Sequence, residues 1–328
     1  MQTRVLGRTG REVGVVGLGC WQLGGDWGRV EESAALDLLA EAVASGVTFL
    51  DTADVYGDGR SEQLIGRFLA ANADLGITVA TKCGRRADPH VPGAYTAANL
   101  REWVDRSRSN LGTDVLDLVQ LHCPPAEVYP DDAVFDAMDS LVEAGAVEAY
   151  GVSVETCDQA LSAIARPHVA TIQIILNAFR LKPLEQVLPA AQAAGVGIIA
   201  RVPLASGLLS GRYDLSTQFG ADDHRTYNRH GDAFDVGETF SGVPYEVGVA
   251  AAREIAALAP DGIPTAAFAL RWIIDQPGVS VVIPGARNAD QVRGNAAAVQ
   301  VPALAPSAHE AVRDVYDRLV RPHVHDRW

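Results

Sequence analysis

Three ionisable residues stand where short apolar runs of the sequence end. Asp51 follows "VTFL", Lys82 follows "ITVAT" and His122 follows "LDLVQL", while Tyr56 lies in a glycine-containing turn shortly after Asp51. Taken alone, Asp51 is equally compatible with a catalytic carboxylate and with a residue that caps the next turn. Three such strand ends in succession favour catalysis, because the carboxyl ends of neighbouring barrel strands meet at one rim.

These residue types suggest proton transfer by a phenol. A lysine beside a buried tyrosine favours the tyrosinate and lowers the pKa of the phenol, and an aspartate paired with the lysine holds the ammonium in place. The pattern therefore predicts that Tyr56, next to Lys82 and Asp51, is a proton donor usable near neutral pH.

The elements that position these residues form a repeating pattern. Apolar runs typical of buried parallel strands alternate with amphipathic stretches such as residues 31–46, where Leu36, Leu39, Ala40 and Val43 share one face and Gly46 supplies a stop. The eight runs cover residues 13–19, 47–51, 77–82, 116–122, 147–153, 169–175, 196–201 and 279–285. Eight strand-helix units predict a (β/α)8 TIM barrel.

A doubly wound sheet is disfavoured because the glycine-rich segment "GLGCWQLGG" lacks the GxGxxG spacing of a Rossmann fold. Two short extended pieces around "RTG" in "TRVLGRTGREV" predict an N-terminal β-hairpin that closes the barrel floor. Residues 212–245 form a long polar segment after the seventh strand, without clear periodicity. This position favours a lid or binding loop at the barrel mouth over plain disorder.

Length and composition narrow the class of protein. The 328 residues, 48% of them hydrophobic, are expected to form a single barrel domain over residues 1–328. No run is long enough to cross a bilayer and no signal peptide is recognisable, which predicts a cytoplasmic protein with no membrane partner. The net charge of -14, without a Lys/Arg cluster, disfavours nucleic acid as a partner.

Metal binding is not expected from the sequence. The four cysteines are widely scattered and form no CxxC pair, which predicts reduced thiols rather than metal ligands or disulfide bonds. The two histidines of the terminal "PHVHDRW" are expected to lie in a solvated, mobile tail.

The sequence resembles the aldo-keto reductase family, whose bacterial members include NADPH-dependent enzymes, over nearly its whole length. The resemblance rests on "DTADVYG", on the strand ends "TK" and "QLH", and on "GLGCW", which follow one another in the family's order. It implies a (β/α)8 barrel that reduces aldehydes or ketones with NADP(H), and a catalytic tetrad of Asp51, Tyr56, Lys82 and His122. In the family mechanism a hydride passes from the nicotinamide to the carbonyl carbon, the tyrosine protonates the oxygen, and the histidine orients the carbonyl.

The same resemblance implies where the nicotinamide and the pyrophosphate bind. Ser153 and Gln173 correspond to residues that hold the nicotinamide amide. The segment "PLASGLLSG" resembles the loop that passes the pyrophosphate, with backbone contacts from Leu204, Ser206 and Gly207.

At the adenosine end, "VIPGARNADQVRGN" resembles the segment that grips this part of the cofactor, with Arg287 on a 2′-phosphate and Gln291 and Asn295 beside the adenine. The alternative for Arg287 is an exposed arginine at a helix start. One departure concerns Arg201, which replaces an aromatic residue that commonly stacks on the nicotinamide. Arg201 is expected either to stack through its planar face or to pair with a phosphate.

The substrate pocket is less clearly encoded. Trp21 corresponds to an aromatic residue of the family's pocket, and Trp27, Arg85 and Tyr129 lie on loops at the same rim. Mixed aromatic and polar walls favour a small polar carbonyl compound such as a hydroxyaldehyde or a sugar. Two alternatives to a reductase stay open: an NAD(P)-dependent sugar or hydroxyaldehyde dehydrogenase, and an NADPH-binding regulatory protein with low turnover. No signature of oligomerisation stands out.

Overall fold

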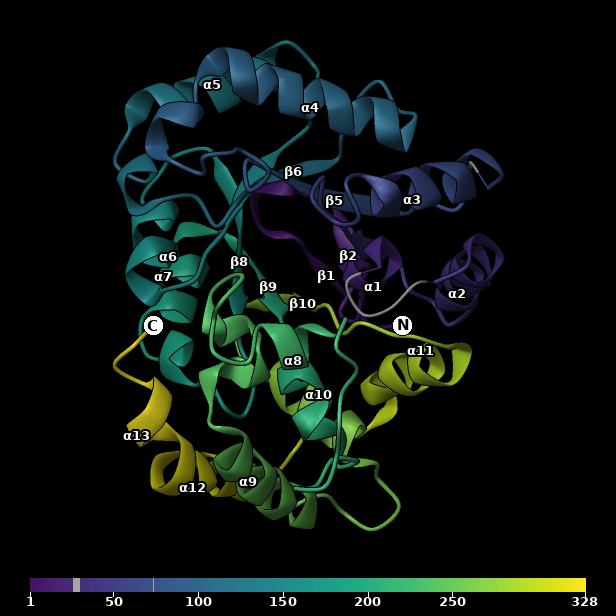
Figure 1. Cartoon of the computed structure of the whole chain (residues 1–328), viewed down its shortest axis with the longest axis vertical. Coiled ribbons are helices and arrows are strands. Elements are labelled where there is room, and N and C mark those ends of the chain that lie inside the picture. The colour runs from purple at the N-terminus through teal and green to yellow at the C-terminus, as the bar shows by residue number, and fades with distance from the viewer. Residues whose placement is uncertain (26–29, 73) are drawn as a thin grey trace.

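The computed structural model describes residues 1–25, 30–72 and 74–328 and confirms the predicted barrel (Figure 1). Within the described chain, eight parallel strands lie side by side in sequence order, and each pairs with the next. They are β3 (Leu18–Gly19), β4 (Phe49–Asp51), β5 (Thr78–Cys83), β6 (Leu118–His122), β7 (Tyr150–Ser153), β8 (Val169–Ile175), β9 (Gly197–Arg201) and β10 (Val279–Val282). Parallel bridges from Val16 to Val282 and from Gly19 to Gly285 join the last strand to the first and close the barrel.

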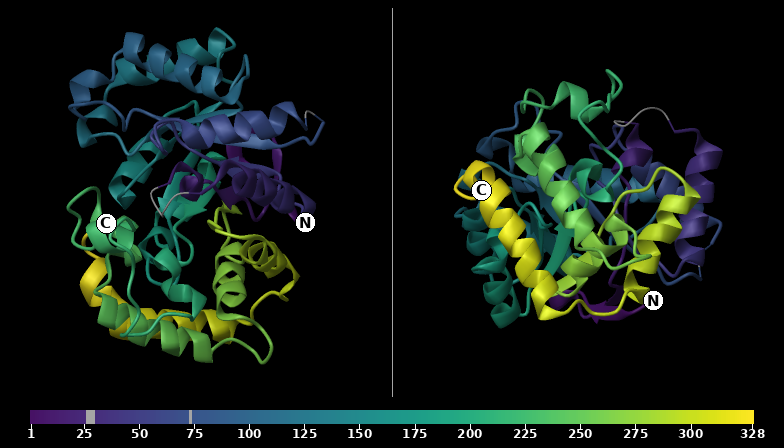
Figure 2. Two further views of the ribbon diagram at one scale, coloured as in Figure 1. Left: turned by 45° about the vertical axis from the view of Figure 1, so that its right-hand side comes forward. Right: turned by 90° about the horizontal axis from the view of Figure 1, so that it is seen from below.

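Helices cover the outer face of the strands, as the alternating pattern predicts (Figures 1 and 2). The helices of the described chain are, in chain order, α1 (Trp21–Gly24), α2 (Glu32–Ala44), α3 (Arg60–Ala70), α4 (Ala97–Leu111), α5 (Asp132–Glu143), α6 (Cys157–Ile164), α7 (Val187–Ala194), α8 (His224–Tyr227), α9 (Tyr245–Ala257), α10 (Thr265–Ile274), α11 (Ala289–Ala296), α12 (Pro306–Val315) and α13 (Arg321–Val324). Of these, α1 and α8 lie at the open end of the barrel rather than on its outer face (Figure 1). No helix of the described chain has the length and apolar character needed to cross a membrane.

Helix α2 shows how far periodicity alone predicts packing. The helix ends at Ala44, close to the predicted stop at Gly46. Its buried residues are Ala35, Leu38, Leu39 and Ala42. The predicted face of Leu36, Leu39, Ala40 and Val43 is therefore rotated by about one residue position from the buried one.

The predicted hairpin is also present. Strands β1 (Thr3–Val5) and β2 (Glu12–Gly14) pair antiparallel, so Val13 and Gly14 belong to the hairpin rather than to the first barrel strand. Leu6 and Val13 are fully buried and pack with the apolar side chains that fill the barrel interior. These interior residues are Phe49, Ala80, Leu118, Ile199, Val281 and Ile283. The hairpin thus seals one end of the barrel and leaves the carboxyl ends of the strands as the open rim.

The long segment after β9 folds against the rest of the molecule. It contains α8 and the short turns η6 (Val236–Glu238) and η7 (Phe240–Gly242). The expectation of a mobile C-terminal tail is wrong, because Trp328 is buried and its Nε1 donates a hydrogen bond to Asp235 Oδ1 at 3.0 Å. The guanidinium of Arg180 lies 4.0 Å from the Trp328 ring. The chain end therefore anchors the segment that follows β9.

Candidate active site

Neighbouring strands bring the predicted polar residues to one level of the rim. His122 at the end of β6 pairs in register with Ser153 at the end of β7, and Ser153 pairs in turn with Gln173 on β8. Asp51 ends β4 next to β5, which carries Lys82. All five side chains are buried. The strand ends that the sequence marks thus converge in three dimensions.

Lys82 is the centre of a buried hydrogen-bond network. Its ammonium donates to Asp51 Oδ1 at 2.6 Å and to the carbonyl oxygen of Thr52 at 2.8 Å, and it lies 3.4 Å from the hydroxyl of Tyr56. Gln173 donates to the second carboxylate oxygen of Asp51 at 2.7 Å. Burial lowers the pKa of Lys82, but Asp51 and Tyr56 together raise it by more, so the pKa ends above its ordinary value. The ammonium is therefore charged and fixed beneath the phenol.

The expected lowering of the Tyr56 pKa is wrong for this structure. Burial raises the pKa of Tyr56 to about 12, and the opposing effect of Lys82 is smaller. The pKa of His122 lies well below its usual range because of burial and of the nearby charges of Arg85, Lys82 and Arg201. At neutral pH the site thus holds a protonated phenol and a neutral imidazole, whose rings lie edge to face with centroids 6.0 Å apart.

Two glycines set the position of the Tyr56 loop. Gly57 adopts a left-handed backbone conformation at φ 59°, and a Cβ on it would lie 2.2 Å from the carbonyl oxygen of Gly24. Only glycine allows this approach of the loop to α1. As a result Trp21, which begins α1, stacks near Tyr56 with ring centroids 6.0 Å apart.

A cavity of about 480 Å³ opens above these residues. Its lining includes eleven of the residues singled out in the sequence: Trp21, Asp51, Tyr56, Gln173, Arg201, Leu204, Ser206, Gly207, Arg287, Gln291 and Asn295. Lys82, His122 and Ser153 are not among the lining residues. The cavity therefore joins the Tyr56 hydroxyl to the segments expected to hold a nucleotide.

The lining fits a dinucleotide phosphate. Gly207 has φ 97°, and a Cβ there would lie 2.6 Å from the ring of Tyr213. The backbone turn after β9 therefore packs closely against Tyr213, another residue of the lining. Arg201, Arg212, Arg225 and Arg287 all contribute to the lining; Arg201 and Arg225 are buried and paired with Glu238 and Asp223, whereas Arg212 and Arg287 present exposed guanidinium groups. Such groups recognise phosphate oxygens well, which matches the cofactor that the sequence resemblance implies.

At the far end of the cavity, Arg287 is exposed and its backbone N–H donates to the side chain of Gln291 at 2.7 Å. Asp290 also belongs to the lining. Its carboxylate accepts a hydrogen bond from Arg293 at 2.5 Å, which offsets its negative charge. Asn295 donates to the carbonyl oxygen of Gly285 at 3.2 Å.

Three predicted substrate residues have different surroundings. Arg85 is not in the lining itself but contacts it through Glu238, to which its Nη1 donates at 3.0 Å. Tyr129 is buried in the hydrophobic core and borders a second hollow beside Pro130 and Arg166, so the structure does not bring it to the main cavity. Trp27 falls outside the described residues.

Four lining residues of the segment after β9 were not predicted from the sequence: Arg212, Tyr213, Arg225 and Glu238. Arg225 illustrates how they are held: its Nη1 donates to the Tyr213 hydroxyl at 2.7 Å and its Nη2 to Asp223 at 2.5 Å. No periodicity marks such residues, because tertiary contacts fix them. The only available signal was the density of charged and aromatic residues in a long loop.

Comparison with known proteins agrees with this architecture. The model of the Aldo/keto reductase family matches residues 15–317. An uncharacterized oxidoreductase of Mycobacterium tuberculosis is 33% identical over 321 residues, which cover 95% of this chain and 91% of that protein. The glycerol dehydrogenase of Gluconobacter oxydans is 30% identical, with a TM-score of 0.79 and coverage of 97% of this chain and 95% of its own.

An aldo-keto reductase of Klebsiella pneumoniae, solved in complex with NADPH, shares the fold at 24% identity with a TM-score of 0.70 and coverage of 96% of both chains. The family match spans nearly all of the barrel and includes the five strands that carry Asp51, Lys82, His122, Ser153 and Gln173. The chain therefore belongs to the aldo/keto reductase family of oxidoreductases.

Proposed function

We propose that this chain reduces aldehydes or ketones to alcohols with NADP(H), with Tyr56 as the proton donor. The observation that carries the proposal is the Asp51–Lys82–Tyr56 network at the floor of a cavity lined by arginines. The complex of the Klebsiella pneumoniae relative with NADPH supports the choice of cofactor. We further propose that residues 1–328 act as one barrel domain and that the substrate is a small carbonyl compound.

Each part of the cavity has a role in this proposal. Ser153 and Gln173 would hold the nicotinamide end of the cofactor, Leu204, Ser206 and Gly207 the pyrophosphate, and Arg287, Gln291 and Asn295 the adenosine end. When bound, the reduced nicotinamide would supply the hydride.

The protein's own contribution is proton transfer and orientation. Tyr56 donates its proton to the carbonyl oxygen as negative charge develops there, and the fixed ammonium of Lys82 stabilises the tyrosinate that results. Asp51 keeps that ammonium in place. His122, neutral and buried, orients the carbonyl next to the phenol.

A second candidate is oxidation of a polyol or sugar, which the glycerol dehydrogenase relative favours. A screen of aldehydes and ketones with NADPH and NADH, and of polyols and sugars with the oxidised cofactors, tests both. Reduction of aldehydes with NADPH supports the proposal. Turnover of alcohols alone would favour the dehydrogenase, and tight binding of NADPH without turnover would favour a regulatory protein.

The pH dependence follows from the raised pKa of Tyr56, which is about 12. Reduction requires the protonated phenol, which is fully present at neutral pH, whereas oxidation requires the phenolate. We expect the reductive kcat to stay flat between about pH 6 and about pH 9 and the oxidative kcat to rise throughout that range. A reductive rate that falls with a midpoint near neutral pH would contradict this result.

Cofactor choice depends on Arg287. A charge-assisted contact with the 2′-phosphate is worth roughly 1.5–3 kcal/mol, which corresponds to a preference for NADPH over NADH of about ten- to a hundredfold. Arg287→Ala is expected to weaken NADPH binding by that factor and to leave NADH binding unchanged, as measured by calorimetry. Arg313→Ala, at an exposed position of α12, serves as the matched control. Equal loss of both cofactors would place Arg287 at a part of the cofactor that both share, and an unchanged affinity for both would leave it as a surface residue without this role.

A further inference from the structure

The carboxylate of Glu238 forms ion pairs with two arginines, Arg85 and Arg201, at the cavity that contains Tyr56. One oxygen, Oε1, lies 3.0 Å from Arg85 Nη1 and 3.6 Å from Arg201 Nη1. The three residues come from distant parts of the chain: Arg85 follows β5, Arg201 ends β9 and Glu238 ends the turn η6. All three side chains are largely buried, with exposed fractions of 19%, 9% and 12%.

Glu238 and Arg201 line the cavity together with Trp21 and Tyr56. Glu238 is held there by its backbone, whose carbonyl oxygen accepts a hydrogen bond from Ser206 at 3.1 Å. Burial raises the pKa of Glu238, but Arg85 and then Arg201 lower it by more, so the group is ionised at neutral pH. A substrate carbonyl placed at Tyr56 therefore has this charged group as a neighbour.

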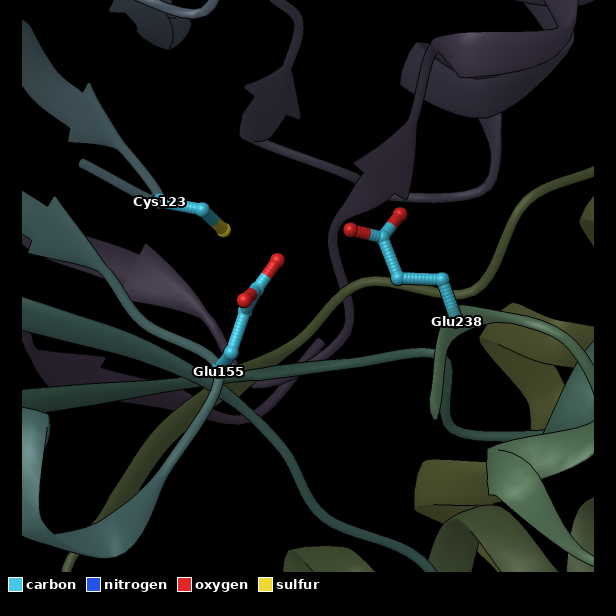
Figure 3. A group of neighbouring side chains, drawn as sticks. All are labelled: Cys123, Glu155 and Glu238. Carbon is cyan, nitrogen blue, oxygen red and sulfur yellow. The ribbon is translucent and has the colours of Figure 1, made fainter. Parts of the chain in front are cut away.

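Cys123 and Glu155 are neighbours of Glu238 (Figure 3). Ligand atoms of Cys123, Glu155 and Glu238 lie within 4.8 Å of one another, a spacing that could also suit a cation. However, Glu238 already faces two guanidinium groups, and Arg201 Nη2 also lies 3.8 Å from the Cys123 sulfur. These positive charges oppose a further cation, so we interpret Glu238 as the counter-ion of the arginines.

This charge arrangement determines which substrates fit. A carboxylate on the substrate would either lie beside Glu238, where like charges repel, or displace it from Arg85 and leave it buried without its partner. Both outcomes are unfavourable. A neutral carbonyl compound with hydroxyl or amide groups causes neither the repulsion nor the loss of the ion pair, because such groups hydrogen-bond to both guanidinium and carboxylate groups.

We propose that Glu238 is a specificity-determining residue that excludes anionic carbonyl substrates in favour of uncharged polar ones. The inference rests on the proposed function, because it assigns the substrate class of the same site.

The test uses two aldehydes of matched shape and different charge, succinic semialdehyde and its primary amide, with NADPH and the full chain. The wild type is expected to prefer the amide. Glu238→Gln keeps the shape of the side chain and leaves both arginines without this counter-ion. It should raise the ratio of kcat/KM for the semialdehyde over that for the amide by about ten- to a hundredfold.

Arg85→Gln should move the same ratio in the opposite direction, and it keeps the proposal testable if Glu238→Gln does not fold. Glu246→Gln, which removes an exposed carboxylate from α9, is the control for net charge and should leave the ratio unchanged. Calorimetric binding of succinate gives a readout independent of turnover, and binding should be tighter in Glu238→Gln than in the wild type.

An unchanged ratio in both variants, or succinate binding no tighter in Glu238→Gln, would overturn the role of Glu238. If the wild type reduced neither aldehyde, the failure would lie with the proposed function. The succinate measurement would still decide the role of Glu238 in that case.

Discussion

Replacing Tyr56 with phenylalanine is expected to lower kcat for carbonyl reduction by about two to four orders of magnitude, the usual contribution of a positioned general acid. The substitution removes only the hydroxyl that lies 3.4 Å from the Lys82 ammonium and leaves the ring beside Trp21. The affinity for NADPH, measured by calorimetry, should therefore stay within about twofold of the wild type.

Tyr150→Phe is the matched control for the loss of a buried phenol. Tyr150 begins β7, whereas the site lies at the strand's other end, and its hydroxyl donates to Asp139 at 2.7 Å. The free energy of unfolding of this variant should fall by about 1 kcal/mol, and its kcat should equal that of the wild type. Reduction at the wild-type rate by Tyr56→Phe would remove Tyr56 from the mechanism. An equal fall in kcat in Tyr56→Phe and Tyr150→Phe would point to a general effect of losing a buried hydroxyl.

Lys82→Met is expected to reduce both activity and stability. The ammonium that stabilises the tyrosinate is lost, which should lower kcat by about a hundredfold or more. The Asp51 carboxylate, whose exposed side-chain fraction is 4%, loses the partner at 2.6 Å. Breaking such a buried pair from one side typically costs about 3–5 kcal/mol, so chemical denaturation should show a correspondingly lower free energy of unfolding.

The double variant Asp51→Asn/Lys82→Met separates the two effects. It removes the unpaired carboxylate and should regain most of the lost stability, because Gln173 can still hydrogen-bond the asparagine side chain. Activity should stay low, since the ammonium is still absent. Recovery of activity together with stability would mean that Lys82 acts only through folding.

The strands and the strand-end chemistry were predictable because both depend on local sequence. Buried parallel strands are apolar almost throughout, so a polar residue such as Lys82 or His122 at the end of a run stands out. Strand register then determines which strand-end residues are neighbours, and it places His122, Ser153 and Gln173 next to one another. The strand-end pattern predicted that Asp51, Lys82 and His122 meet at the rim, whereas Ser153 and Gln173 were expected there from the family resemblance.

The remaining features depend on contacts between distant segments. The position of Glu238 between Arg85 and Arg201 requires the fold of the long segment after β9, and its anchor, Trp328, is the last residue of the chain. The raised pKa of Tyr56 depends on burial that only the assembled pocket provides. Tyr129 likewise lies on a rim loop in sequence, yet its ring packs into the core.

The most direct test of the central claim is deuterium transfer from NADPH labelled at its reactive ring carbon to an aldehyde. Mass spectrometry of the alcohol product follows the label, with Tyr56→Phe assayed in parallel. The account predicts one deuterium on the former carbonyl carbon with the wild type and slow formation of the same labelled alcohol with Tyr56→Phe. Alcohol formed without deuterium, or labelled alcohol formed equally fast by both proteins, would contradict it.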